Sequence, residues 1–157
     1  MQELSPDREP SLAFSEARRR RFELHGALVQ LEKEISSPVR GQARDWTADV
    51  TKAMTILQAA FDVHVEATER PGGLYEEILE NSPRLAGGVR RLREEHPAIR
   101  AAIRSLLVRL VPPDADDATV DGVRDDVQRV MGQVVRHRQR GADLVWEAYN
   151  LDIGGDE

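Results

Sequence analysis

Apolar residues recur along most of the chain in alternating steps of three and four positions, which is the spacing of one buried face of a packed α-helix. The period-two alternation of a half-buried strand is almost absent. Turn-forming residues interrupt the helical spacing in three places, at residues 36–42, 70–73 and 111–117. The pattern therefore predicts an all-α protein, folded as a bundle of four long helices.

The predicted bundle occupies residues 11–150, and the segments 1–10 and 151–157 are expected to form flexible tails. The third long helix is predicted to open with Ser82 as its N-cap and Pro83 at its first helical position. A short extra helix is expected in the connection between the second and third helices, at residues 74–80. The other three long helices are expected at residues 11–35, 44–69 and 118–149.

Histidines fall on the apolar seams of these predicted helices. His64, His96 and His137 occupy seam positions of the second, third and fourth helices, and His25 lies between two apolar stripes of the first. An imidazole buried without a partner costs about 1–3 kcal/mol, so each needs a carboxylate, a carbonyl, a water or a metal ion. Neutral imidazole nitrogens are good ligands for iron, zinc and copper. The alternative is four separate core histidines, each satisfied locally.

Charge and composition narrow the function classes. The 22 basic residues against 28 acidic ones give a net charge of −6, which argues against a nucleic-acid partner. The absence of cysteine excludes thiolate metal sites and cysteine nucleophiles, and it fits a reducing, cytoplasmic compartment. The N-terminal segment predicts neither a secretion signal nor a membrane anchor. No phosphate loop, nucleotide fingerprint or serine triad is present, which leaves enzymatic activity open and favours a non-enzymatic role.

Four segments occur in a distinctive order: FELHGALVQLEKEI, HVEATE, LREEHPAI and HRQRGADLVWEAY. Over residues 22–149 this order resembles the hemerythrin-like, or HHE cation-binding, domains. The resemblance implies an up-down-up-down four-helix bundle around non-haem iron, which binds or senses oxygen, peroxide or nitric oxide, or handles iron. Carried over by position, the imidazole ligands would be His25, His64, His96 and His137.

The sequence departs from the family pattern at the carboxylates that bridge two irons. Thr68 and Gly141 stand one turn after the histidines of the second and fourth helices, where the family usually supplies them. Glu69 is the nearest replacement and is predicted to be a metal ligand. A mononuclear site, a zinc site and a lost site therefore stand beside the di-iron site. The competing hypothesis is a metal-free bundle that serves as a regulatory or protein-interaction module.

Three other features receive structural interpretations. The arginine run at residues 18–21 is interpreted as a solvated helix face, with an anionic partner as the alternative. Glu94 and Glu95 are adjacent in a helix, so they point in different directions and are assigned to the surface. Tyr75 is interpreted as a packing aromatic. The metal hypothesis requires the four imidazoles to lie at one level of the bundle.

Overall fold

The computed structural model of the chain describes residues 10–39, 41–110 and 117–151. These residues contain helices and no strand, which confirms the all-α prediction. Each predicted helix is present, with ends that differ from the expected ones by a few residues at most. The elements in chain order are α1 (Leu12–Ser36), α2 (Ala43–Glu69), α3 (Leu74–Asn81), the 3₁₀ turn η1 (Pro83–Leu85), α4 (Ala86–Arg109), α5 (Asp117–Trp146) and the π-helical turn η2 (Glu147–Leu151).

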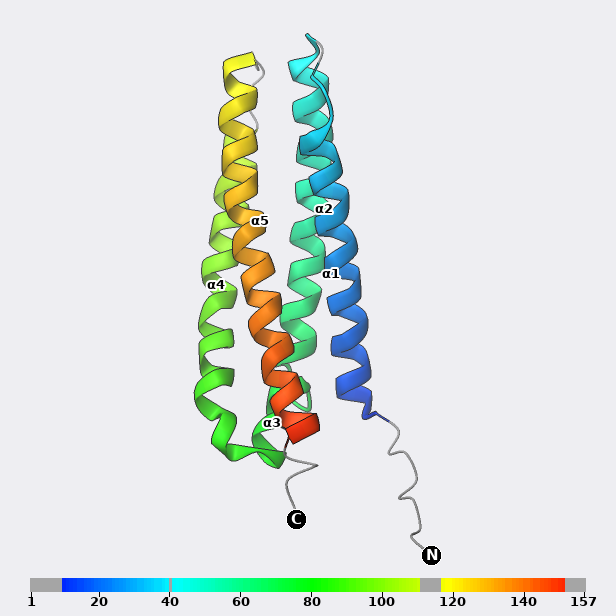
Figure 1. Cartoon of the computed structure of the whole chain (residues 1–157), viewed down its shortest axis with the longest axis vertical. Helices are drawn as coiled ribbons and strands as arrows, with labels where there is room; N and C mark the ends of the chain where they lie inside the picture. Colours follow the sequence, from blue (N-terminus) through cyan, green and yellow to red (C-terminus); the bar gives the residue numbers. More distant parts are fainter. Residues whose placement is uncertain (1–9, 40, 111–116, 152–157) are drawn as a thin grey trace, which may run out of the picture.

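Figure 1 shows the four long helices lying side by side, with each running opposite in direction to the one before it. The short helix α3 lies across one end of the molecule, where α1 and α4 begin and α2 and α5 end. The expected tails, residues 1–10 and 151–157, lie outside the described residues except for their positions 10 and 151. None of the described helices combines the length and the apolar character that a membrane span requires.

Local signals fix this end of the molecule. Ser11 caps α1, because its Oγ accepts a hydrogen bond from the Phe14 amide at 3.0 Å and donates one to Glu77 of α3 at 2.8 Å. Gly72 has φ of +74°, a left-handed conformation that lets α2 turn sharply into α3. Ser82, the predicted N-cap of the third long helix, precedes η1 instead, and its side chain makes no capping hydrogen bond.

Two apolar clusters fill the interior. The larger is built from α1, α2, α4 and α5 and includes Leu57, Phe61 and Val134. The smaller surrounds α3 and includes Leu92 and Leu144. On α4 and α5 a histidine lies between the two clusters: His96 follows Leu92 of the smaller cluster, and His137 follows Val134 of the larger one. With His64 of α2, which contacts both rings, they form a polar layer between the clusters.

The far end of α1 is held by Arg124 of α5. Its Nε donates a hydrogen bond to the Ile35 carbonyl at 2.9 Å, and a terminal nitrogen donates one to the Ser37 carbonyl at 3.2 Å. The guanidinium carbon lies 5.2 Å from the centre of the Trp46 ring, and the Trp46 Nε1–H donates to the Glu34 carbonyl at 3.1 Å. One arginine thus satisfies helix-end carbonyls, for which a cation is electrostatically suited.

We predict that Arg124→Met lowers the free energy of unfolding by about 1–2 kcal/mol, because it removes two hydrogen bonds and the cation–π contact while keeping the aliphatic stem. Arg129→Met is the control, since Arg129 pairs with Asp126 on the exposed surface and such pairs contribute less than about 1 kcal/mol. Urea unfolding measures both. Equal losses for the two variants would contradict the role of Arg124.

Candidate metal centre

Three imidazoles converge in the layer between the two apolar clusters. The Nε2 atoms of His64 and His137 lie 3.2 Å apart, and those of His96 and His137 lie 3.1 Å apart. One potential ligand atom from each of the three histidines lies within 4.8 Å of the other two, and all three residues are buried. Phe61 lies beneath them, with its ring centre 5.7–5.8 Å from each imidazole centre. Helices α2, α4 and α5 therefore each supply one inward-facing nitrogen.

Two of the three nitrogen separations match the ligand shell of a transition metal. With metal–nitrogen distances of about 2.0–2.1 Å, neighbouring ligand nitrogens lie about 3.3 Å apart in a tetrahedral site and about 2.9 Å apart at right angles. The two observed Nε2 separations, 3.1 and 3.2 Å, fall between these values. The third pair, His64 and His96, has ligand nitrogens within 4.8 Å of each other, so side-chain shifts that bring these two rings closer would allow the three histidines to share one ion.

Proton placement also favours a cation at this point. His137 Nδ1 lies 2.9 Å from a Glu95 carboxylate oxygen, so this nitrogen carries the hydrogen and Nε2 presents its single lone pair to the other two rings. That lone pair accepts one well-aligned hydrogen bond, from His64 or from His96. The second Nε2–Nε2 contact with His137 then has no well-placed proton between its nitrogens, which costs about 1–3 kcal/mol. A bound cation would use all three lone pairs.

The outer nitrogens have unequal partners. Glu95 is held in turn by Arg140, so a carboxylate and a guanidinium fix the orientation of the His137 ring. Burial raises the pKa of Glu95, but its hydrogen bonds with Arg140 and His137 outweigh burial and leave the pKa lowered. The Nδ1 atoms of His64 and His96 are buried without a hydrogen-bond partner. The His137 ring is therefore the most firmly oriented of the three.

The three imidazoles are held in the neutral form that metal ligation requires. Burial is the largest cause and lowers the pKa of His64 to about 3, with the charges of His137, Arg138 and Arg21 acting in the same direction. Burial, followed by His64 and His137, lowers the pKa of His96 to about 2. Burial also lowers the pKa of His137, against the opposing effect of Glu95.

Tyr75 of α3 brings an oxygen to the same point. Its hydroxyl lies 3.3 Å from His96 Nε2, the nitrogen that faces the other two histidines, and its ring stacks on the His96 ring at 5.8 Å and 17°. Burial raises the pKa of the Tyr75 phenol, so the group is a neutral hydroxyl in the metal-free protein. An oxygen thus lies beside the group of three nitrogens, next to His96 Nε2.

Two predicted ligands lie elsewhere. His25 is exposed on α1, where its Nδ1 accepts a hydrogen bond from Arg138 at 3.4 Å, so the prediction that four imidazoles converge is wrong for this residue. The cause is its position beside the apolar stripe of α1, not on it. Glu69 lies 3.5 Å from His96 Nδ1, on the opposite side of that ring from the converging nitrogens. The Glu69 carboxylate therefore does not face the central position.

Thr68 and Gly141, which stand where carboxylates were expected, do not supply a ligand. The Thr68 hydroxyl donates to the main-chain carbonyls of His64 and Val65, each at 3.0 Å. Gly141 has no side chain and lines a cavity beside the histidines. Within the described part of the chain, the three histidines form the one group of potential ligands close enough to share an ion. This arrangement suits one ion rather than two.

Sequence reasoning missed the roles of Glu95 and Tyr75. Glu95 was assigned to the surface, yet its side chain is only 17% exposed and contacts His137. The sequence contains only a weak signal for Glu95. It precedes the seam residue His96, and such a residue contacts another helix only if that helix packs on the same side of α4. Tyr75 sits on the short helix α3, whose placement against His96 is not encoded in any spacing along the chain.

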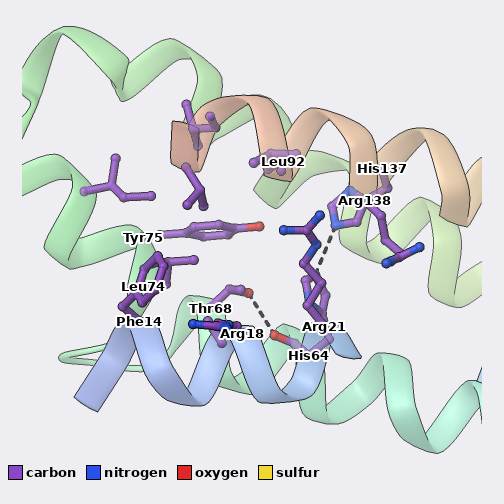
Figure 2. A pocket seen from close by; sticks show the side chains of 15 residues that line it. Phe14, Arg18, Arg21, His64, Thr68, Leu74, Tyr75, Leu92, His137 and Arg138 are labelled. Atoms are coloured by element: carbon purple, nitrogen blue, oxygen red, sulfur yellow. Dashed lines mark hydrogen bonds between the residues drawn. The ribbon is translucent and has the colours of Figure 1, made fainter. Parts of the chain in front are cut away.

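A cavity of about 280 Å³ opens beside the histidines, with His64 and His137 among its lining residues (Figure 2). Its walls are mainly apolar and include Leu74, Ile78 and Leu144. Figure 2 shows Arg21 extending from α1 across the cavity toward the hydroxyl end of Tyr75. A small molecule can therefore approach His64 and His137 without any rearrangement of the helices.

Comparisons of the chain with models of protein families, with curated proteins and with solved structures give no match. The assignment of this centre therefore rests on its own geometry and chemistry.

We predict that the metal-free protein loses stability as the pH falls from 7 to 5. His64 and His96 stay neutral when folded but bind protons near pH 6.5 when unfolded, so acid favours the unfolded state. Below that pH, each histidine that stays neutral in the folded protein lowers the free energy of unfolding by about 1.4 kcal/mol per pH unit. Denaturant unfolding with a chelator present measures the free energy of unfolding at each pH. In the His96→Leu variant this free energy should depend less steeply on pH than in the wild type. Equal slopes would contradict the neutral, buried state of His96.

Proposed function

We propose that this chain is a hemerythrin-like up-down-up-down bundle that binds one iron ion through His64, His96 and His137, and uses it to bind or sense a small oxidant such as oxygen, nitric oxide or peroxide. The observation that carries the proposal is the convergence of three Nε2 atoms on one buried point. The order of the four histidine-containing segments supports the family assignment. We propose a mononuclear centre, because the residues expected to bridge two ions are Thr68 and Gly141.

The donor set supports iron over a purely structural metal. Three imidazoles and the Tyr75 oxygen form a mixed nitrogen and oxygen set, which suits iron and also zinc, while the absence of cysteine removes the thiolates typical of structural zinc sites. Bound iron would supply an open coordination position and a change of oxidation state. Zinc bound in place of iron would keep the site and remove the redox function.

The surrounding residues orient the ligands and control access. The Glu95–Arg140 pair holds the His137 ring, with the Nδ1–H directed at the carboxylate. Phe61 and the apolar cluster around it close the side of the site away from the cavity. The cavity, by contrast, reaches His64 and His137, so a small ligand would arrive from that side. The competing function, a metal-free interaction module, does not account for the three nitrogens that face one another in the core.

We predict that the purified chain binds one iron per molecule when ferrous iron is supplied under reducing conditions, and that His96→Leu abolishes this binding. The variant deletes a ligand, so the stabilisation that the ion supplies is lost, about 2.7 kcal/mol when free iron is 100 times the dissociation constant. Elemental analysis and thermal unfolding, each with and without iron, measure both quantities. His25→Gln is the control, since His25 lies outside the cluster, and it should retain iron.

The alternatives give different results in the same experiment. If the bundle is metal-free, His96→Leu replaces a buried polar group with an apolar one, and the variant melts at or above the wild-type temperature whether or not iron is present. That result, with no iron bound by the wild type, would refute the proposal. If the protein retains zinc in place of iron, the three histidines would be assigned as a zinc site.

We predict that Tyr75 supplies the fourth ligand in the ferric protein. Coordination by the phenolate oxygen should then give a visible phenolate-to-iron absorption band. Tyr75→Phe should remove this band and weaken the affinity for iron by no more than about tenfold. Tyr149→Phe is the matched control, because the Tyr149 hydroxyl binds Glu77 away from the histidines. Visible spectra of equal intensity in wild type and Tyr75→Phe would contradict ligation by Tyr75.

A further inference from the structure

The cavity beside the histidines combines an apolar interior with a cationic mouth. Leu74, Ile78, Leu92 and Leu144 contribute to its walls, and Arg21 of α1 and Arg138 of α5 line it from two helices (Figure 2). A metal site for a diatomic ligand requires neither a cavity of about 280 Å³ nor two guanidinium groups. These features indicate a larger ligand that has both an apolar part and a negative charge.

The two arginines lack the carboxylate partners that several other arginines in this protein have. Within residues 10–39, 41–110 and 117–151, neither Arg21 nor Arg138 pairs with a carboxylate, whereas Arg100 and Arg109 each pair with an aspartate at 2.9 Å. The Nε of Arg138 is buried without a hydrogen-bond partner, and a terminal nitrogen of Arg138 donates to His25 Nδ1 at 3.4 Å. Arg18 lines the same cavity, so Arg21 and Arg138 belong to a cationic group that forms a local site for an anion in a chain of net charge −6.

We propose that this cavity binds a small organic monocarboxylate, with its apolar body between α3 and α5 and its carboxylate at Arg21 and Arg138. Guanidinium groups match the planar carboxylate through paired N–H donors. A cavity of about 150 Å³ holds benzene, so about 280 Å³ accommodates a body of about eight to ten carbon atoms. His64 and His137 also line the cavity, but the proposed contacts are made by the arginines and the apolar walls, so binding does not require the metal.

Other ligand classes fit these features less well. An inorganic anion would leave the apolar walls in contact with water, and a neutral hydrocarbon would leave both guanidinium groups uncompensated. A long-chain lipid exceeds the volume of the cavity. An eight-carbon fatty acid anion, octanoate, is therefore the appropriate probe, with acetate and octanol as probes that each lack one of its two properties.

The first test measures octanoate binding to the full-length, chelator-treated protein by isothermal titration calorimetry. We expect octanoate to bind at least tenfold more tightly than acetate or octanol. Arg21→Gln and Arg138→Gln should each weaken octanoate binding about tenfold, because each removes a charge-assisted contact. Arg19→Gln is the matched control, since Arg19 belongs to the same arginine run but does not line this cavity, and it should change the affinity less than twofold.

The second test fills the cavity without altering either arginine. A side chain added at Gly141, which lines the cavity, would meet no atom within 4 Å at its Cβ, so Gly141→Leu should enter the open space and abolish octanoate binding. The same substitution at Gly122, an exposed position on the same helix with no atom near its Cβ, should leave binding unchanged. Because leucine favours helix more than glycine, both variants should melt no lower than wild type.

Three outcomes would overturn the proposal: no octanoate binding to the folded wild type, equal binding of octanoate and octanol, or unchanged binding in Gly141→Leu. The result is separable from that of the metal proposal, because the measurement uses metal-free protein and the iron content is determined independently. Binding of octanoate by a protein that takes up no iron would support the cavity assignment and refute the metal proposal. Iron uptake by a protein that does not bind octanoate would support the metal proposal and refute the cavity assignment.

Discussion

The structure around the candidate site depends on one constraint: three imidazole nitrogens are held within 4.8 Å of one another inside an apolar interior, with those of His64 and His96 only 3.2 and 3.1 Å from that of His137. Burial keeps the rings neutral, and neutral rings have a limited number of protons to share. Two apolar clusters flank this polar layer, so the histidines are enclosed from above and below. The layer is consequently both the least favourable part of the core without a ligand and the best arranged part for receiving one.

The unequal support of the three rings has a consequence for how such a site would assemble. His137 is oriented by Glu95 and Arg140, whereas His64 and His96 have outer nitrogens without hydrogen bonds. A fixed ring on α5 and two less constrained rings on α2 and α4 allow small adjustments around an ion. Tyr75 approaches from α3, the short helix that closes this end of the molecule (Figure 1). Four different helices thus contribute to a single point.

Electrostatics around the cavity differ from those of the chain as a whole. The protein carries a net charge of −6, yet the groups that line the approach to the histidines include Arg18, Arg21 and Arg138. Elsewhere on the described surface several arginines pair with nearby acidic residues, as Arg70 does with Glu16. A positive region therefore persists where a negative ligand would enter, and it adds to the forces that keep His64 neutral.

The sequence by itself determined the helices and which histidines face inward on three of them. Spacing of apolar residues is a local property, and it placed His64, His96 and His137 on buried faces, where the structure has them. It failed for His25, because a residue between two stripes turns toward solvent or core according to how its helix is rotated against its neighbours. Only the tertiary structure decided that the three histidines share one level, since level depends on how far each helix slides against its neighbours. The same packing brought Glu95 to His137 and Tyr75 to His96, and it turned Glu69 away from the shared nitrogens. These contacts join helices far apart in sequence, and no periodicity along one helix specifies them.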